Sequence, residues 1–139
     1  MTKKYKIIID TNLWISFLLT KRFEFIDKLL NNGSIELVFC TELLREFIEV
    51  SNRSKLRKFF TNEEWRLIFE IIERYSIIVS IKSCVTLCRD VKDNFLLSLS
   101  KDAQADYLIT GDKDLLILKH FETTRILTIS EFETISKAL

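Results

Sequence analysis

The chain has few or none of several residue types that mark particular classes of protein. Its 139 residues include no proline, two glycines, one histidine and three cysteines. With so little glycine and 47% hydrophobic residues, it is neither collagen-like, nor disordered, nor of low complexity. An odd cysteine count, without an apolar signal segment at the start, argues against a disulfide framework and predicts a cytoplasmic protein.

Long hydrophobic runs and an excess of one charge are also absent. Charged residues interrupt every apolar stretch before the roughly 18 residues that a membrane span needs. The 21 basic and 20 acidic residues give a net charge of +1, which excludes a broad basic surface that coats nucleic acid. A polyanion would therefore be bound locally. No linker rich in Gly, Pro or Ser divides the chain, so residues 1–139 are predicted to form a single domain.

Apolar, β-branched runs alternate with longer segments of helical spacing, which predicts a layered α/β fold. The near-continuous apolar character of the runs is typical of strands buried on both faces of a parallel sheet. Two capping boxes, Thr61 with Glu64 and Ser130 with Glu133, mark expected helix starts, and His120 is expected in a loop. The expected strands are 5–9, 35–39, 77–79, 107–109 and 125–129; the expected helices cover 13–19, 23–30, 43–50, 65–72, 95–99 and 132–138.

Acidic residues recur at the ends of the predicted strands. In an open parallel sheet the ligand site lies at the carboxyl ends of the strands, so these acids are expected to converge. Crowded carboxylates repel one another unless a cation lies between them. Oxygen ligands favour Mg²⁺ or Mn²⁺, and one histidine with three scattered cysteines gives little support to zinc. The acids are Asp10, Glu42, Glu46, Asp90, Asp93, Asp112 and Asp114.

Each of these acids also has a purely structural interpretation. Asp10 could cap the helix that follows it, yet an ionised side chain that closes an apolar strand favours a functional role. Glu46 could pair with a neighbouring arginine, Asp93 could be a helix N-cap, and Asp112 is a common residue in a turn after glycine. These three gain functional weight only in combination.

Four stretches resemble the PIN-domain nucleases, and within that family the branch of VapC-like toxins of type II toxin–antitoxin systems. They occur in the expected order and are IIIDTNLWIS (7–16), TELLREF (41–47), RDVKDNFLLSL (89–99) and ADYLITGDKDLL (105–116). The resemblance implies a three-layer α/β/α sandwich with a central, mainly parallel five-stranded sheet. It also implies an endoribonuclease, the toxin of such a pair, that cleaves RNA phosphodiesters with water activated by Mg²⁺ or Mn²⁺.

The resemblance also implies roles for individual residues. Asn12 matches the polar residue that supports the first aspartate, and Asp114 matches a further acid. The chain departs from the branch pattern where a proline usually lies between the two aspartates of the third stretch, because Val91 and Lys92 stand there. The implied partners are an RNA substrate, a cognate antitoxin and a second copy of the chain in a homodimer. The catalytic and metal-binding quartet comprises Asp10, Glu46, Asp93 and Asp112.

Cations near the acidic cluster are expected to hold the RNA backbone. A run around residues 53–58 has no acid within it, and two lysines flank the cluster itself. Trp14 and Trp65 could stack on bases, but they fit helical apolar stripes and are expected in the core. The candidate RNA-binding residues are Arg53, Lys55, Arg57, Lys58, Lys92 and Lys113.

Three other classes of protein could also have acids at the ends of their strands. A flavodoxin-like phosphate acceptor needs an acidic pair after the first strand, an aspartate after the third and a lysine after the fifth, none of which is present. A haloacid-type phosphatase needs a second aspartate where Asn12 stands. A catalytically silent PIN-like module that binds RNA or protein stays open, because an intact acidic quartet does not by itself establish cleavage.

Overall fold

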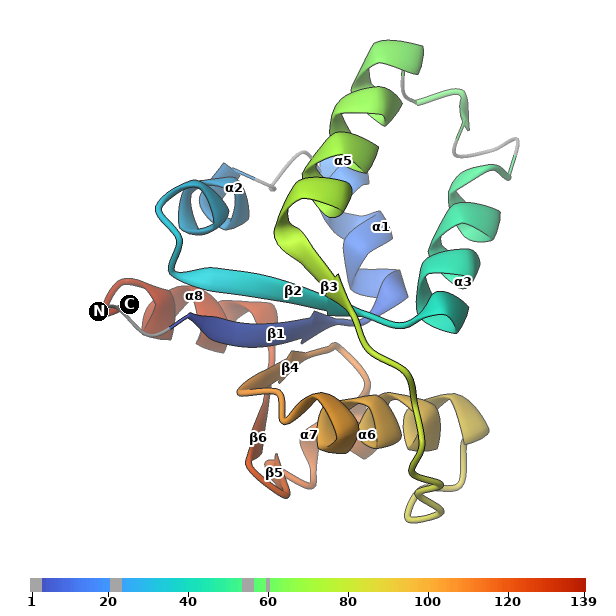
Figure 1. The fold of residues 1–139 in the computed structure, drawn as a ribbon, viewed down its shortest axis with the longest axis vertical. Coiled ribbons are helices and arrows are strands. Elements are labelled where there is room, and N and C mark those ends of the chain that lie inside the picture. The colour runs from blue at the N-terminus through green and yellow to red at the C-terminus, as the bar shows by residue number, and fades with distance from the viewer. Residues whose placement is uncertain (1–3, 21–23, 54–56, 60) are drawn as a thin grey trace.

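The computed structural model describes residues 4–20, 24–53, 57–59 and 61–139, and its strands and helices alternate as the sequence predicts (Figure 1). The strands are β1 (Tyr5–Ile9), β2 (Ile35–Phe39), β3 (Ser76–Ile78), β4 (Tyr107–Ile109), β5 (His120–Phe121) and β6 (Thr124–Leu127). The helices are α1 (Thr11–Thr20), α2 (Glu24–Asn31), α3 (Thr41–Ser51), α5 (Asn62–Tyr75), α6 (Val91–Ala103), α7 (Lys113–Leu116) and α8 (Ile129–Ser136).

The strands form one sheet in the order β3-β2-β1-β4-β6-β5. All neighbouring pairs are parallel except β5 with β6, which is antiparallel. The predicted α/β class with a central, mainly parallel sheet is therefore confirmed. The sheet has six strands rather than the five expected, because the chain between β4 and β6 forms a short hairpin.

This hairpin corrects the expectation that His120 lies in a loop. His120 pairs with Arg125 across β5 and β6, and Phe121 pairs with Thr124. Lys119 and Glu122 have φ angles of 62° and 54°, the left-handed conformations in which the chain enters and leaves so short a strand. The strands predicted at 77–79 and 125–129 each begin one residue earlier, at residues 76 and 124.

The helix starts are confirmed at one predicted capping box and corrected at the other. Thr61 and Glu64 form the box that begins α5, with two hydrogen bonds of 3.1 Å. The box of α8 consists of Thr128 and Glu131, not Ser130 and Glu133. β6 ends at Leu127, so Thr128 is the first residue outside the sheet, and Ser130 already lies within the helix.

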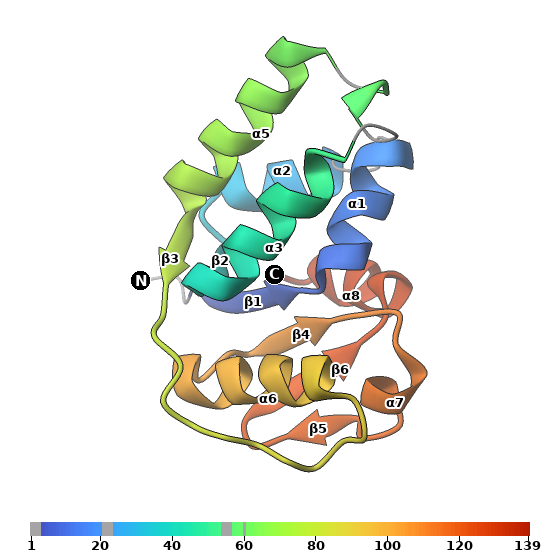
Figure 2. The same ribbon diagram turned by 90° about the vertical axis from the view of Figure 1, so that its right-hand side faces the viewer.

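The helices lie on both sides of the sheet. The strand order advances from β1 to β3 and then returns to β4 on the other side of β1. Because crossovers between parallel strands are right-handed, this reversal places α6 on the face opposite the helices between β1 and β3. Figures 1 and 2 show α1, α2, α3 and α5 on one side of β1 and α6 and α7 on the other.

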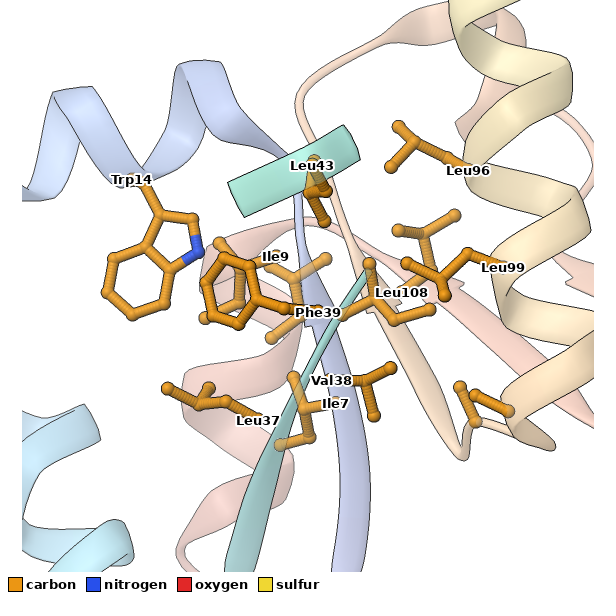
Figure 3. Close-up of a cluster of buried hydrophobic side chains, with 14 of the residues drawn as sticks. Ile7, Ile9, Trp14, Leu37, Val38, Phe39, Leu43, Leu96, Leu99 and Leu108 are labelled. Carbon is orange, nitrogen blue, oxygen red and sulfur yellow. The ribbon is translucent and has the colours of Figure 1, made fainter. Parts of the chain in front are cut away.

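The core is built on the central strands, where Figure 3 shows Ile7 and Ile9 beside Leu37, Phe39 and Leu108. Trp14 is 1% exposed, and its ring lies 6.2 Å from that of Phe39 and 6.0 Å from that of Phe47. Trp65 is 3% exposed. Both tryptophans are therefore core residues, as predicted, and the buried apolar area fixes the strand ends that carry the acids.

An extended segment, residues 79–90, links β3 to α6 along the outside of that helix (Figure 2). Three polar side chains spaced four residues apart on α6 hold it, so they lie on one face of the helix. The pairs are Asn94 with the main chain of Cys88 (2.6 and 2.9 Å), Ser98 with Val85 N (3.0 Å), and Asp102 with Lys82 N (2.6 Å) and Ser83 N (2.8 Å). This segment therefore delivers residues 88–90 to the start of α6 in a fixed position.

Candidate active site

Six of the seven predicted acids gather where the strand order reverses, between the carboxyl ends of β1 and β4, whereas Glu42 is exposed on the first turn of α3. Helices leave these two strands in opposite directions, which opens a crevice there and makes it the usual ligand position in such sheets. Asp10 follows β1 directly, and its backbone N–H donates to Ile109 O at the end of β4 (3.0 Å). In Figure 1, β1 and β2 end on the side where α1 and α3 begin.

Asp10 serves the local structure and lines the crevice at once. Its carbonyl accepts hydrogen bonds from Leu13 N and Trp14 N, and its Oδ1 accepts one from Asn12 N (3.2 Å), so it caps α1. Oδ2 accepts a hydrogen bond of 2.9 Å from the hydroxyl of Thr110. At 6% exposure Asp10 is a buried acid, and both of its oxygens are held in place. The structural interpretation and the functional one are therefore compatible.

Thr110 is a residue of the site that sequence reasoning missed. It is completely buried, and its Oγ1 donates to Asp10 Oδ2 while accepting a hydrogen bond from Asp112 N (3.1 Å). This one hydroxyl joins the acid after β1 to the acid after β4. Its place directly after a predicted strand was the available signal.

Asp112 and Asp114 enter the crevice from a short helix that the sequence did not predict. Asp112 is the N-cap of α7, and its Oδ1 accepts a hydrogen bond from Asp114 N (2.8 Å). Asp114 is exposed and forms an ion pair with Arg89 (3.4 Å), which the 79–90 segment brings to this point. Asp112 is thus a helix N-cap rather than the turn residue that the sequence suggested, and its carboxylate lies near those of Asp93 and Asp114.

Asp93 is the most enclosed acid of the cluster, with 2% of its surface exposed. Its Oδ2 is buried without a hydrogen-bond partner among the described residues. Burial, followed by the charge and hydrogen bonding of Asp112 and the charges of Asp90 and Asp10, raises the pKa of Asp93 to about 6. The N-cap of α6 is Asp90, whose Oδ1 accepts from Lys92 N (2.9 Å), so the capping interpretation of Asp93 is wrong.

Carboxylate oxygens of Asp93, Asp112 and Asp114 lie within 4.8 Å of one another, a spacing that could hold a metal ion. Asp10, Asn12 and Asp112, together with Leu13 and Gly111, line an adjacent cavity of about 360 Å³. The donors are hard oxygen atoms, the type that Mg²⁺ and Mn²⁺ prefer. A divalent ion here would give Asp93 Oδ2 the partner it lacks and offset the mutual repulsion of the acids.

Glu46 extends from α3 to the mouth of the same crevice, where it pairs with a basic side chain of the protein, Lys92. Its Oε1 lies 3.0 Å from Lys92 Nζ, and about one third of each side chain is exposed. Burial alone lowers the pKa of Lys92, but the hydrogen bond and charge of Glu46 and the charges of Asp10 and Asp90 outweigh it and raise that pKa overall. The predicted partner of Glu46, a neighbouring arginine, is thus replaced by a lysine from α6.

Cys88 borders the acidic group. Burial raises the pKa of its thiol, and the charges of Asp93, Asp114, Asp112 and Asp90 raise it further. The thiol is therefore held in its protonated form, which is a poor metal ligand. Its backbone is fixed on both sides by Asn94, as described above.

The other predicted RNA-binding cations lie around this mouth and beyond α3. Lys113 is exposed at the start of α7, and Arg53, Arg57 and Lys58 are exposed between α3 and α5. Lys55 lies outside the described residues. Within the part of the chain that the structure covers, no helix is long and apolar enough to cross a membrane.

Comparisons with known proteins extend over most of this architecture. A family model described as "PIN domain" matches residues 6–114, from β1 to the start of α7. An uncharacterized protein of Methanocaldococcus jannaschii is 31% identical over 125 residues, which cover 84% of this chain and 76% of that protein. No solved structure matches. The matched range contains all seven acids that the sequence singled out.

Proposed function

Because the chain belongs to the PIN-domain family, whose members are generally metal-dependent nucleases, we propose that it is a hydrolase that cleaves RNA endonucleolytically with Mg²⁺ or Mn²⁺. The observation that carries this proposal is Asp93 Oδ2, a buried carboxylate oxygen without a partner, next to two further carboxylates. Folding such a group costs free energy unless a ligand compensates it. A divalent cation is the ligand that fits the donors.

The acids of this chain take separate parts in the proposed reaction. Asp93 and Asp112 would hold the ion, with Asp10 and Asp114 beside them, directly or through water. When bound, the ion supplies a Lewis acid that acidifies a water molecule and offsets charge on the phosphate. Thr110 keeps Asp10 oriented, and Asn12 lines the cavity that receives the phosphodiester. Glu46, held by Lys92, orients the attacking water.

The proposal also includes a role as the toxin of a toxin–antitoxin pair, a cytoplasmic location and specific partners. Exposed Arg53, Arg57, Lys58 and Lys113 would bind the phosphates that flank the cleaved bond, with Lys55 added to that run. A cognate antitoxin and a second copy of the chain are the proposed protein partners. Light scattering of the purified chain tests the homodimer, and co-purification with the product of an adjoining reading frame tests the antitoxin.

The direct test is cleavage of a labelled single-stranded RNA with and without Mn²⁺, alongside a DNA strand of the same sequence. We expect RNA fragments that require Mn²⁺, disappear with EDTA and are absent with Asp93→Asn. Asp27→Asn, an acid on α2 remote from the crevice, is the matched control and should cleave normally. RNA binding without cleavage by folded, metal-loaded wild type would instead identify the silent binding module.

A further inference from the structure

The ion pair between Glu46 and Lys92 crosses the mouth of the crevice and joins two elements that are distant in sequence. Glu46 lies on the second turn of α3, which follows β2, whereas Lys92 lies on the first turn of α6, on the other face of the sheet. Their charged atoms are 3.0 Å apart, within the range of a charge-assisted hydrogen bond. With about two thirds of each side chain covered, this contact is better shielded from solvent than the pair of Arg89 with Asp114.

The two sides of the crevice therefore differ in how their negative charge is compensated. On the α3 side, an ammonium group faces Glu46, and the charges of Asp10 and Asp90 act on the same ammonium. On the α7 side, Asp93 and Asp112 face each other, and Asp93 Oδ2 has no partner within the described residues. Arg89 pairs with the exposed Asp114 on this side, but among the described residues no ion pair compensates Asp93 or Asp112.

We propose that this site binds a single divalent ion, between Asp93 and Asp112, and that the Lys92 ammonium is its resident second cation, paired with Glu46. The inference rests on the proposed function. Many phosphodiester-cleaving sites use two metal ions about 3.5–4 Å apart as a clamp on the reacting phosphate. Here the Lys92 ammonium, which is part of the protein, stands in the position of the second metal ion. Lys92 is therefore a positioning residue that keeps Glu46 out of the metal's coordination shell.

Two consequences distinguish this arrangement from a two-metal site. A second divalent ion would have to displace the ammonium from Glu46 and enter beside its positive charge, which is unfavourable at such short distances. The wild-type protein should therefore bind one Mn²⁺, and cleavage should rise with the first power of Mn²⁺ concentration. Removal of the lysine charge should create the vacancy that a second ion can fill.

The test is a Mn²⁺ titration of metal-free protein, followed by the electron paramagnetic resonance signal of free Mn²⁺. We expect one bound ion for wild type and two for Lys92→Met, or a single ion bound about tenfold more tightly. Lys101→Met, on the last turn of the same helix, is the matched control and should behave as wild type. The double variant Lys92→Met/Glu46→Gln should return to one ion, because it restores the charge balance.

Glu46→Gln alone supplies an independent measurement that does not depend on the lysine variant folding. If Lys92 is the partner of Glu46, this substitution leaves one ion bound and weakens its binding by at most about tenfold, the effect of one lost negative charge. Loss of a direct ligand would weaken binding beyond the roughly 10–100-fold typical of outer-shell partners. A large loss, or two ions in wild type, or no response to Lys92→Met, would overturn the inference alone. Wild type that binds no Mn²⁺ would overturn the proposed function as well.

Discussion

At the scale of single residues, the site depends on one carboxylate that is unfavourably placed in the metal-free protein. Asp93 is buried, close to other acids and only partly hydrogen-bonded, and its pKa rises from 3.8 to about 6. Its ionised form therefore destabilises the fold at neutral pH, while its protonated form does not. The metal-free protein is therefore less stable than it would be without this charge, but its site is already formed to accept a cation.

Replacement of Asp93 by asparagine should accordingly stabilise the metal-free protein. A group with a raised pKa contributes stability below its unfolded value and loses it as the pH rises through the folded value. At pH 8 we expect Asp93→Asn to increase the free energy of unfolding in urea by roughly 1–3 kcal/mol. The gain should shrink as the pH falls below about 6. Asp27→Asn, on α2, is the matched control, and a destabilised Asp93→Asn would contradict this account of the site.

Metal affinity should depend on pH through the same carboxyl group. Protons compete with the metal for Asp93, so Mn²⁺ affinity should be constant well above pH 6 and fall up to about tenfold per pH unit below it. Calorimetry in two buffers of different ionisation enthalpy would detect the proton released near pH 6. An affinity that stays constant from pH 8 to 5 would show that Asp93 does not bind the ion.

The acids of the site were predictable from sequence, whereas their connections were not. Asp10 directly follows an apolar strand and Asp112 lies three residues after another, so both stand out as acids at the ligand edge of the sheet. Thr110 was missed because its one signal, a position directly after a predicted strand, does not by itself separate a site residue from a structural one. The pairing of Glu46 with Lys92 depends on how α3 and α6 approach each other across the sheet, and no local pattern encodes that distance.

At the scale of elements, α6 positions the site through the segment bound along its outer face. Asn94 both donates to and accepts from the main chain of Cys88, and so fixes the turn that presents Arg89 and Asp90. Asn94→Ala should remove both hydrogen bonds and lower the free energy of unfolding by about 1–3 kcal/mol. Mn²⁺ affinity should fall with it, because the start of α6 is less well held.

Asn62→Ala is the matched control for this variant, since Asn62 is exposed at the first position of α5. Chemical denaturation and the Mn²⁺ titration compare the three proteins. Unchanged stability in Asn94→Ala would mean that the 79–90 segment is not fastened to α6 by this side chain.

The other end of the segment should loosen at low pH. Hydrogen bonds from the Ser83 side chain and backbone lower the pKa of Asp102, with a further backbone contribution from Lys82. A lowered pKa stabilises the fold above the unfolded value, and this stabilisation is lost as the pH falls through the folded value. Compared in an Asp93→Asn background, Asp102→Asn should destabilise the protein at pH 7, and the difference should shrink as the pH falls through the lowered pKa of Asp102. A constant difference would contradict the assignment.

Element boundaries were predictable where burial on both faces makes the apolar run continuous. β1, β2 and β4 begin and end where the sequence predicts, because a polar or small residue (Asp10, Cys40 or Thr110) ends each apolar run. β5 has two residues, too few to show any periodicity, so the hairpin was not predictable. The start of α8 was misplaced by two residues because two hydroxyl–glutamate pairs overlap there, and the end of β6 decides between them.

At the scale of the whole molecule, the net charge is close to zero, but acidic and basic side chains lie in different places. Acids concentrate at the crevice between β1 and β4, where a metal ion can offset them, and described basic residues such as Arg57 and Lys58 are exposed elsewhere. The match to the PIN-domain family indicates the general chemistry of this arrangement, which is metal-dependent nuclease activity. A net charge of only +1 is consistent with a local, metal-centred hold on one phosphodiester.

The most direct test of the central claim compares the rate of RNA cleavage with metal occupancy in the same protein. Single-turnover cleavage is measured over a range of Mn²⁺ concentrations, and Mn²⁺ binding is measured in parallel. The account predicts that the rate rises and saturates with occupancy of the Asp93 site and returns to baseline with EDTA. Folded protein with the site saturated and RNA bound but uncut would contradict it.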